Sequence, residues 1–155
     1  MTVPLLFLDV DGPLIPFGSP SGYRSYGEDG PNPLLSRLDP GHGARLLGLG
    51  YALVWATTWS SDANVHVGPR LGLPDLPVVE WPEEDELVVG LHWKTRTLVE
   101  WAAGRDFAWV DDELTAADRA WVATHHPGRA LLHRIDARTG LTPADYHTLR
   151  SWHST

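Results

Sequence analysis

The chain is built around one segment, Val3-Pro4-Leu5-Leu6-Phe7-Leu8-Asp9-Val10-Asp11-Gly12. The apolar run 5–8 predicts a strand buried inside a parallel sheet, because turn residues bound it. Open α/β sheets bind their ligands at the carboxyl ends of the strands, and two aspartates stand at this end. A glycine that permits a sharp turn follows them. The segment therefore indicates a site for a cation or a phosphoryl group. The alternative is a strand that stops at a polar turn with solvated aspartates.

The length of 155 residues predicts one domain, residues 1–155. Cysteine is absent, which excludes disulfides and thiolate metal ligands. The net charge of −8 argues against an extended nucleic-acid surface, although a small local site for a nucleotide or a nucleic-acid end stays possible. No basic segment precedes the first apolar run, which is too short for a signal peptide or a membrane span. We therefore expect a cytoplasmic protein that does not bind a membrane.

Glycine, proline and serine are dense in residues 13–38, which follow neither a helical nor a strand period. We expect an ordered loop there, a flap over the site. Downstream, apolar runs alternate with helical patterns that open on capping residues and mostly close on glycine. Further strands are expected at about 51–57, 77–81, 107–110 and 130–135. Helices are expected at about 39–50, 60–71, 95–103, 115–124 and 142–152. An acidic turn is expected at 82–86, and residues 87–93 fit either a strand or the approach to a helix.

This order of about five strands alternating with helices predicts an α/β fold. We expect a three-layer, Rossmann-like parallel sheet with helices on both faces. In such a sheet the carboxyl ends of the strands meet at one edge. The polar residues at the strand ends are Asp9 with Asp11, Thr57 with Thr58, and Asp111 with Asp112. Lys94, the single lysine of the chain, opens a helix on the same edge.

These side chains together favour phosphoryl-transfer chemistry. Clustered carboxylates do not all stay ionised without a cation, because like charges raise each other's pKa. Mg²⁺ prefers oxygen ligands and usually joins one or two carboxylates to a substrate phosphate. A carboxylate can also attack phosphorus and form an aspartyl-phosphate. Phosphoryl transfer depends mainly on positioning and on charge neutralisation, for which the lysine and a threonine hydroxyl are suited.

Four segments in this order resemble the motifs of the haloacid dehalogenase-like (HAD-like) phosphohydrolases. The first is the apolar strand with Asp-x-Asp-Gly at 5–12, and the second is the strand that ends in threonine at 53–57. The third is Lys94, and the fourth is the strand that ends in paired aspartates at 109–112. The resemblance covers about residues 3–135.

The resemblance implies a catalytic role for each matched residue. Asp9 would be the nucleophile that takes the phosphoryl group. Asp11 would act as the general acid and then as the general base. Thr57, with Thr58 as the alternative, would hydrogen-bond the phosphoryl group. Lys94 would neutralise charge on the nucleophile and the phosphate.

The resemblance also implies a Mg²⁺ cofactor. Its ligands would be Asp9, the backbone carbonyl of Asp11, Asp111 and, directly or through water, Asp112. Gly12 would let the chain turn sharply beneath the site. Trp59, just after the second motif, and Arg24, on the flap, are candidates for contact with the substrate.

The spacing of the motifs leaves no room for the cap domain that many HAD-like enzymes carry, so we expect an open site. Its substrate would be a small phosphate ester, a phosphoprotein or a nucleic-acid end. The Val-Trp-x-Thr-x-Trp segment at 54–59 and the ending 139–152 are similar to one branch, the HAD domains found among RNA-repair proteins. Two alternatives to a general phosphatase therefore stay open. One is a non-catalytic module that accepts or binds phosphate, and the other is an RNA-end phosphatase.

Overall fold

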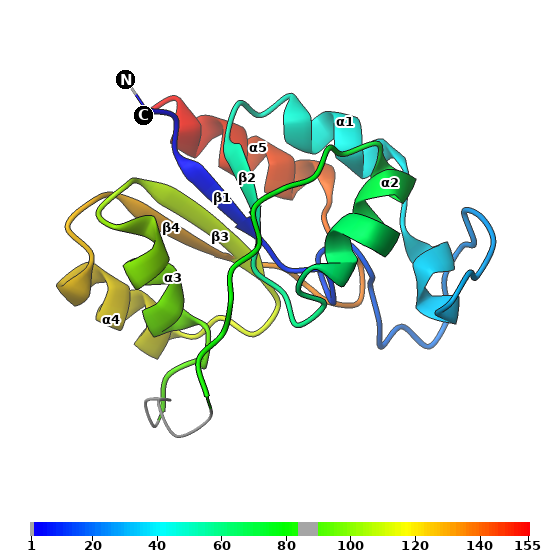
Figure 1. Ribbon diagram of the computed structural model, residues 1–155, viewed down its shortest axis with the longest axis horizontal. Coiled ribbons are helices and arrows are strands. Elements are labelled where there is room, and N and C mark those ends of the chain that lie inside the picture. The colour runs from blue at the N-terminus through cyan, green and yellow to red at the C-terminus, as the bar shows by residue number, and fades with distance from the viewer. Residues whose placement is uncertain (1, 84–89) are drawn as a thin grey trace.

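The computed structural model describes residues 2–83 and 90–155 (Figure 1). Four strands form one sheet in the order β2-β1-β3-β4, and every neighbouring pair is parallel. The strands are β1 (Leu5–Leu8), β2 (Ala52–Trp55), β3 (Phe107–Asp111) and β4 (Ala130–Arg134). The expected α/β fold with a parallel sheet is confirmed, and the arrangement is compatible with a Rossmann-like fold.

The described residues contain four strands where the sequence predicts about five. Segment 77–81 contributes only one parallel bridge, between Trp55 and Val78. In this bridge Trp55 N donates to Pro77 O at 2.9 Å, and Val79 N donates to Trp55 O at 3.0 Å. Prolines at 77 and 82 bound the segment and have no N–H to extend a ladder. Most of the predicted acidic turn 82–86, and the first half of the ambiguous stretch 87–93, lie outside the described residues.

Strand β1 is the centre of the sheet, as its composition indicates. It pairs with β2 on one side and with β3 on the other, and all four of its residues are buried. A strand flanked on both sides and covered on both faces has no solvated side, which explains a continuous apolar run in place of an alternating one.

Within residues 2–83 and 90–155, five α-helices follow the predicted order. They are α1 (Gly41–Leu47), α2 (Gly68–Leu71), α3 (Thr95–Ala102), α4 (Ala116–His125) and α5 (Pro143–His153). The predicted caps Thr115 and Thr142 are confirmed, each in a capping box with an aspartate three residues later. The predicted helix 60–71 is divided into a π-helical turn (Ala63–Val67) and the short α2. Pro69, in the first turn of α2, has no N–H to continue a regular α-helical ladder.

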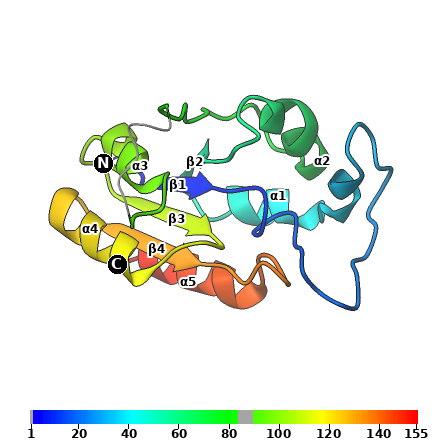
Figure 2. The same ribbon diagram turned by 90° about the horizontal axis from the view of Figure 1, so that it is seen from below.

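Two buried clusters hold the helices against the sheet. Leu5 and Phe7 of β1 belong to one cluster, together with residues of α3 and α4. Leu6 and Leu8 belong to the other, together with residues of α1, α2 and α5. Figure 2 shows α3 and α4 on one side of the strands and α1 and α2 on the other. The alternation of β1 side chains thus fixes both packing faces.

The loop 13–38 runs from the end of β1 toward α1 and contains a 3₁₀ turn (Pro33–Arg37). Its first residues are tightly anchored. Gly12 N donates to Ile15 O at 2.9 Å, Ile15 N donates to Val10 O at 2.9 Å, and Leu14 and Ile15 are buried. Further on, Phe17 N donates to Ala137 O at 2.8 Å. The expected ordered loop therefore begins as a fixed turn beside the two aspartates.

Among the helices of the described ranges, none combines the length and the apolar character needed to cross a membrane.

Candidate functional site

The strand register places the aspartates of β1 and β3 next to each other. Leu8 pairs with Val110 of β3 and with Trp55 of β2, so the next residues, Asp9, Asp111 and Ala56, lie level at the carboxyl edge. Asp9 N donates to Val110 O at 3.3 Å, and Ala56 N donates to Leu8 O at 2.7 Å. The pairing of backbone atoms thus continues one residue past the strands and fixes the positions of both carboxylates.

Lys94 reaches this edge from the residue before α3. Its Nζ lies 2.8 Å from Ala56 O, 2.9 Å from Asp111 Oδ2 and 3.2 Å from Asp9 Oδ1. The lysine is 3% exposed, Asp9 is 7% exposed and Asp111 is 1% exposed. The single lysine of the chain is thus a buried ammonium between two buried carboxylates, on the edge that the sequence predicts.

A third carboxylate completes the acidic group. Asp9, Asp111 and Asp112 each offer an oxygen, and these three oxygens lie within 4.8 Å of one another. Burial raises the pKa of Asp9 to about 8; Lys94 opposes this rise and Asp111 adds to it. Burial, and then the charge of Asp111, raise the pKa of Asp112 to about 6. The carboxylates are therefore costly to ionise together, which is the situation that a bound cation relieves.

These donors fit a hard divalent cation. All three are carboxylate oxygens, the ligand type that Mg²⁺ and Ca²⁺ take, and the three come from one edge of a rigid sheet. The side chain of Asp11 is not part of this group, and the role expected for its backbone carbonyl stays a prediction.

Asp11 instead faces Trp59. The indole Nε1 of Trp59 lies 3.4 Å and 3.3 Å from the two carboxylate oxygens of Asp11 and donates to them. Trp59 does not line the cavity beside the aspartates. Its side chain reaches this region only through its contact with Asp11. Trp59, expected to touch the substrate, is thus placed to orient the carboxylate for which the resemblance implies a role in proton transfer.

Gly12 packs against Asp112. Its φ is +105°, and a Cβ at this position would lie 2.8 Å from both Cγ and Oδ1 of Asp112. Only glycine can adopt this φ without strain and also leave room for the side chain of Asp112. The sharp turn expected at Gly12 is present, and its effect is to let the second aspartate of the fourth motif approach the first motif.

The two threonines of the second motif differ in their surroundings. Thr57 is fully buried, and its Oγ1 accepts a hydrogen bond from Trp59 N at 3.2 Å. Thr58 is exposed and lines the cavity that holds the aspartates. Of the pair, Thr58 is therefore the one placed to meet a ligand, and Thr57 shapes the turn that carries Trp59.

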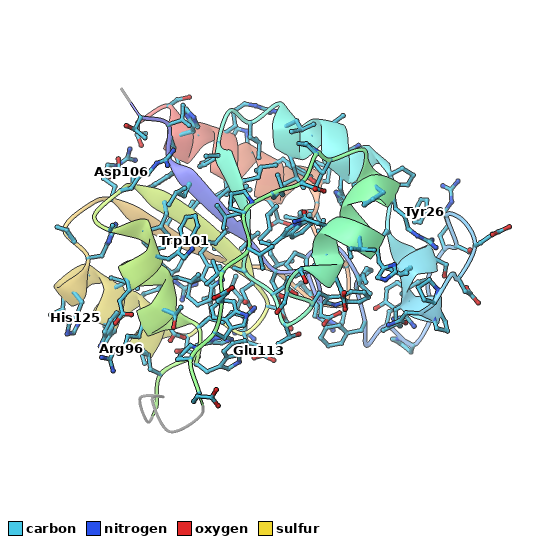
Figure 3. All side chains as sticks on the ribbon, viewed as in Figure 1. Tyr26, Arg96, Trp101, Asp106, Glu113 and His125 are labelled. Carbon is cyan, nitrogen blue, oxygen red and sulfur yellow. The ribbon has the colours of Figure 1, made fainter. Side chains whose placement is uncertain are left out.

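The cavity has a volume of about 160 Å³ and brings together most of the predicted site residues. Asp9, Asp11, Thr58, Lys94, Asp111 and Asp112 line it. Phe17, His92, Trp93 and Glu113 also line it, and the sequence did not single them out for this site. His92 Nε2 lies 3.3 Å from Glu113 Oε2, and Figure 3 shows Glu113 near this edge of the sheet.

A buried aspartate outside the cavity holds the lysine segment in place. Asp118 Oδ1 accepts hydrogen bonds from His92 N at 2.8 Å and from Thr95 Oγ1 at 2.9 Å. Its Oδ2 accepts from Thr115 N and Oγ1, which caps α4. Burial opposes ionisation of Asp118, but these hydrogen bonds outweigh it and lower the pKa. The capping pattern at Thr115 could be read from the sequence; the bonds to His92 and Thr95 could not, because they join distant segments.

Arg24 is not brought to the aspartates. It lines a second cavity, between loop 13–38 and α1, with Tyr23 and Tyr26. Figure 3 shows Tyr26 at the far end of the molecule from α3 and α4, well away from Glu113. Arg24 therefore lies away from the aspartates, and its contact with the substrate stays a prediction.

No protein-family model matches the chain, and neither a curated protein nor a solved structure matches it. The fold and the site define a class: a parallel α/β protein with a buried lysine and three aspartates at the carboxyl edge of its sheet.

Proposed function

We propose that the chain is a Mg²⁺-dependent phosphatase that acts through an aspartyl-phosphate on Asp9, in the manner of the HAD-like phosphohydrolases that its motifs resemble. One observation carries the proposal. Lys94 Nζ bridges Asp9 and Asp111, at 3.2 Å and 2.9 Å, at the edge where the four motif segments meet. The three-layer arrangement of that family belongs to the same proposal.

The geometry of Asp9 suits a nucleophile. Its hydrogen bonds from Val10 N, at 2.8 Å, and from Lys94 fall on Oδ1. In the described residues Oδ2 has no such bond, so it is the oxygen that attacks phosphorus. A bond then forms between Oδ2 and phosphorus, and the bond from phosphorus to the ester oxygen breaks. Lys94 stabilises the negative charge on the transferred group.

Proton transfer falls to Asp11, which lines the same cavity two residues further on. Protonated Asp11 gives its proton to the leaving ester oxygen. Its carboxylate then takes a proton from the water that attacks the phosphorus of the aspartyl-phosphate. The bond from phosphorus to Asp9 Oδ2 breaks, and inorganic phosphate leaves. Trp59 Nε1 holds Asp11 in one orientation during both transfers.

Asp9, Asp111 and Asp112 would hold Mg²⁺. When bound, the cation supplies positive charge that lets Asp9 ionise near neutral pH and that offsets the charge of the phosphate.

The proposal is tested by the hydrolysis of p-nitrophenyl phosphate with Mg²⁺ and with a chelator. We expect activity from the wild-type protein with Mg²⁺, and a loss of at least roughly 10³-fold on chelation or in Asp9→Asn. Asp75→Asn, a change at an exposed carboxylate that lines neither cavity, is the matched control and retains activity. Activity that survives both chelation and Asp9→Asn overturns the mechanism. Stable phosphorylation of Asp9 without turnover would instead favour a phospho-acceptor module.

A further inference from the structure

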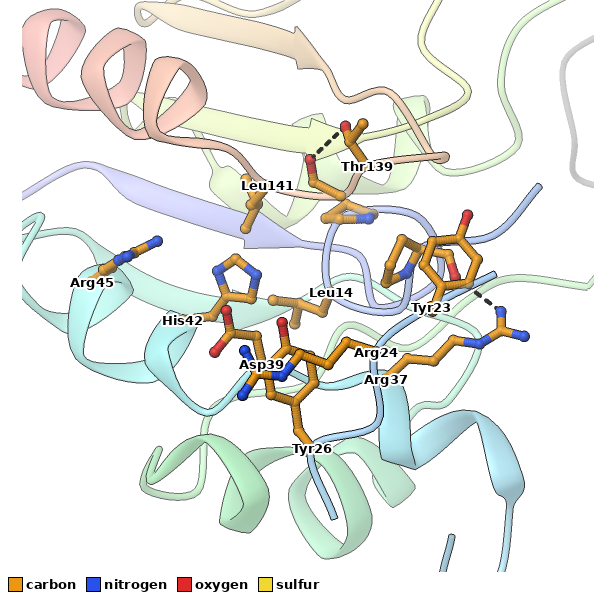
Figure 4. A pocket seen from close by; sticks show the side chains of 13 residues that line it. Leu14, Tyr23, Arg24, Tyr26, Arg37, Asp39, His42, Arg45, Thr139 and Leu141 are labelled. Atoms are coloured by element: carbon orange, nitrogen blue, oxygen red, sulfur yellow. Dashed lines mark hydrogen bonds between the residues drawn. The ribbon is translucent and has the colours of Figure 1, made fainter. Parts of the chain in front are cut away.

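The second cavity has a volume of about 180 Å³ and is lined mainly by loop 13–38, the start of α1 and residues 139–141 (Figure 4). Its charged lining is basic, although the chain as a whole is acidic. The charged residues are Arg24, Arg37, Arg45 and Asp39. Three arginines, two from loop 13–38 and one from α1, thus line one small space together with a single carboxylate.

Two of these arginines have donors to spare. Arg24 and Arg45 form no ion pair and no side-chain hydrogen bond within the described ranges, whereas most other arginines bond a carboxylate or a carbonyl. An aromatic ring backs each of them. Arg24 Cζ lies 4.9 Å from the centroid of Tyr26, and Arg45 Cζ lies 5.8 Å from that of Tyr146. A guanidinium held over a ring keeps its N–H edge free for an oxyanion.

The third arginine builds the wall of the cavity. Arg37 Nη1 donates to Pro16 O at 3.0 Å, and Arg37 Cζ lies 4.7 Å from the centroid of Tyr23. The Tyr23 hydroxyl donates to Arg138 O at 3.0 Å, which ties the loop to the segment before residues 139–141. Figure 4 shows Arg37 directed to this wall and Arg24 directed toward the part of the cavity that holds Asp39. The cavity is therefore preformed.

The floor of the cavity is polar and fixed. His42 is 7% exposed, and its Nδ1 lies 2.6 Å from the hydroxyl of Tyr146. Asp39 is also held, because its Oδ1 accepts from Gly41 N at 2.9 Å. The carboxylate of Asp39 opposes an anion, so its removal and the removal of an arginine must have opposite effects on anion binding.

A single turn separates the two cavities. Asp11 and Phe17 line the cavity that holds the aspartates, and Pro13, Leu14 and Pro16 line the basic cavity. The segment 139–141 closes on this turn, since Leu141 N donates to Pro13 O at 2.8 Å. Segment 11–17 thus contributes residues to the walls of both cavities.

We propose that the basic cavity binds a second phosphate group of the substrate, an assignment that rests on the proposed phosphatase function. Arg24 and Arg45 are its ligands, and Arg37 and Tyr23 position the loop that carries Arg24. Arginine donors matched to phosphate oxygens favour this group over a neutral one. The substrates that fit best are phosphate esters with two phosphate groups, such as nucleoside bisphosphates or short oligonucleotides.

A binding measurement tests the cavity without any need for turnover. Adenosine 3′,5′-bisphosphate is titrated into the protein by calorimetry with a chelator present, so that no cation holds phosphate at the aspartates and the basic cavity is measured alone. We expect Arg24→Gln and Arg45→Gln each to weaken binding about tenfold. We expect Asp39→Asn to strengthen it, and Arg150→Gln, at an exposed arginine of α5, to leave it unchanged. Binding that none of these changes affects overturns the assignment.

A kinetic measurement separates this assignment from the phosphatase function. With Mg²⁺, kcat/KM for the bisphosphate should exceed that for adenosine 5′-monophosphate, and Arg24→Gln should remove the preference while sparing the monophosphate. If wild type and Arg24→Gln prefer the bisphosphate over the monophosphate to the same degree, the basic cavity does not bind the second phosphate. Absence of hydrolysis of either nucleotide, with binding that still depends on Arg24 and Arg45, would reject the phosphatase function and retain the anion site.

Discussion

Lys94 meets three acceptors that point in different directions: a backbone carbonyl and one oxygen each from Asp9 and Asp111. A compact ammonium satisfies such a set better than a planar guanidinium. Apart from Lys94, the chain uses arginine wherever it has one of these two basic residues. The geometry of the three acceptors explains why position 94 is a lysine.

We expect Lys94→Met to lower kcat for p-nitrophenyl phosphate by roughly 10²–10³-fold, because it removes the positive charge beside the transferred phosphate. Lys94→Arg, the charge-conserving control, should recover only part of this loss, because its fork cannot meet all three acceptors. Steady-state kinetics on variants shown to be folded by circular dichroism provide the comparison. A Lys94→Met enzyme with wild-type kcat would exclude the lysine from the chemistry.

Individual residues could be predicted where the residue type alone is informative. Aspartates at the end of a buried strand and a lone lysine are of this kind, and the structure brings them together. The exposure of Thr58 but not Thr57, and the contact of Trp59 with Asp11, depend on the path of the backbone after β2. Position in the fold also decides that Arg24 lies in a different cavity. Residue type alone therefore predicts neither the exposure of Thr58, nor the contact of Trp59 with Asp11, nor the place of Arg24.

The turn after β1 depends on Gly12. We expect Gly12→Ala to destabilise the protein by roughly 1–3 kcal/mol, because alanine is strained at a φ of +105° and its Cβ would press on Asp112. Gly22→Ala is the matched control, with a φ of +73° and no atom within 4 Å of the new Cβ. Its cost should be about 1 kcal/mol. Urea unfolding measures both, and equal losses would show that the contact with Asp112 is unimportant.

The start of α4 is coupled to the lysine segment through Asp118. We expect Asp118→Ala to cost roughly 2–4 kcal/mol of unfolding free energy and also to lower kcat, because both the α4 cap and the support of His92 and Thr95 are lost. Asp145→Ala removes the equivalent capping box of α5, together with the contact between Asp145 Oδ1 and His133 Nε2 at 2.7 Å. Helix α5 packs in the other buried cluster, away from α3 and α4. It should cost roughly 1–2 kcal/mol and leave kcat unchanged. If Asp118 positions the site, kcat falls in Asp118→Ala but not in Asp145→Ala. An equal kcat in the two variants would contradict this role.

Helices and strands could be predicted from the sequence to within a few residues where capping residues or long apolar runs mark them. The caps of α4 and α5 and the four strands belong to this group. The π-helical turn Ala63–Val67 and the single bridge at Val78 were not predicted, although prolines 69, 77 and 82 interrupt the backbone hydrogen bonding in these segments.

The order of the strands in the sheet determines which residues meet at the site. No local sequence pattern predicts that order. β1 lies between β2 and β3, so that Asp9 stands next to Asp111 on one side and Ala56 on the other. The general rule for parallel sheets predicts that the strand ends meet, but the neighbours of each strand come from packing of the whole chain.

The stability of the molecule should depend on pH through His42. Burial lowers the pKa of His42 below its usual 6.5, an effect that Asp39 opposes and Arg45 reinforces. The unfolded chain therefore binds the proton at His42 more readily than the folded one, so the contribution of His42 to stability is full above about pH 7.5 and is lost as the pH drops below 6.5. Urea unfolding isolates this contribution: as the pH drops from 8 to 5, the unfolding free energy of wild type should decrease relative to that of His42→Asn, which keeps a partner for Tyr146. If the unfolding free energies of wild type and His42→Asn change with pH in the same way, His42 does not cause the dependence.

Phosphorylation of Asp9 tests the proposed chemistry most directly. Asp11→Asn lacks the general base that would hydrolyse the aspartyl-phosphate, while an aryl phosphate needs little help from a general acid. After incubation of Asp11→Asn with p-nitrophenyl phosphate and Mg²⁺, mass spectrometry of the intact and digested protein should find one phosphoryl group, on Asp9. Rapid hydrolysis by the wild-type protein with no phosphoryl group on Asp9 of this variant, or with the group on another residue, would contradict the mechanism.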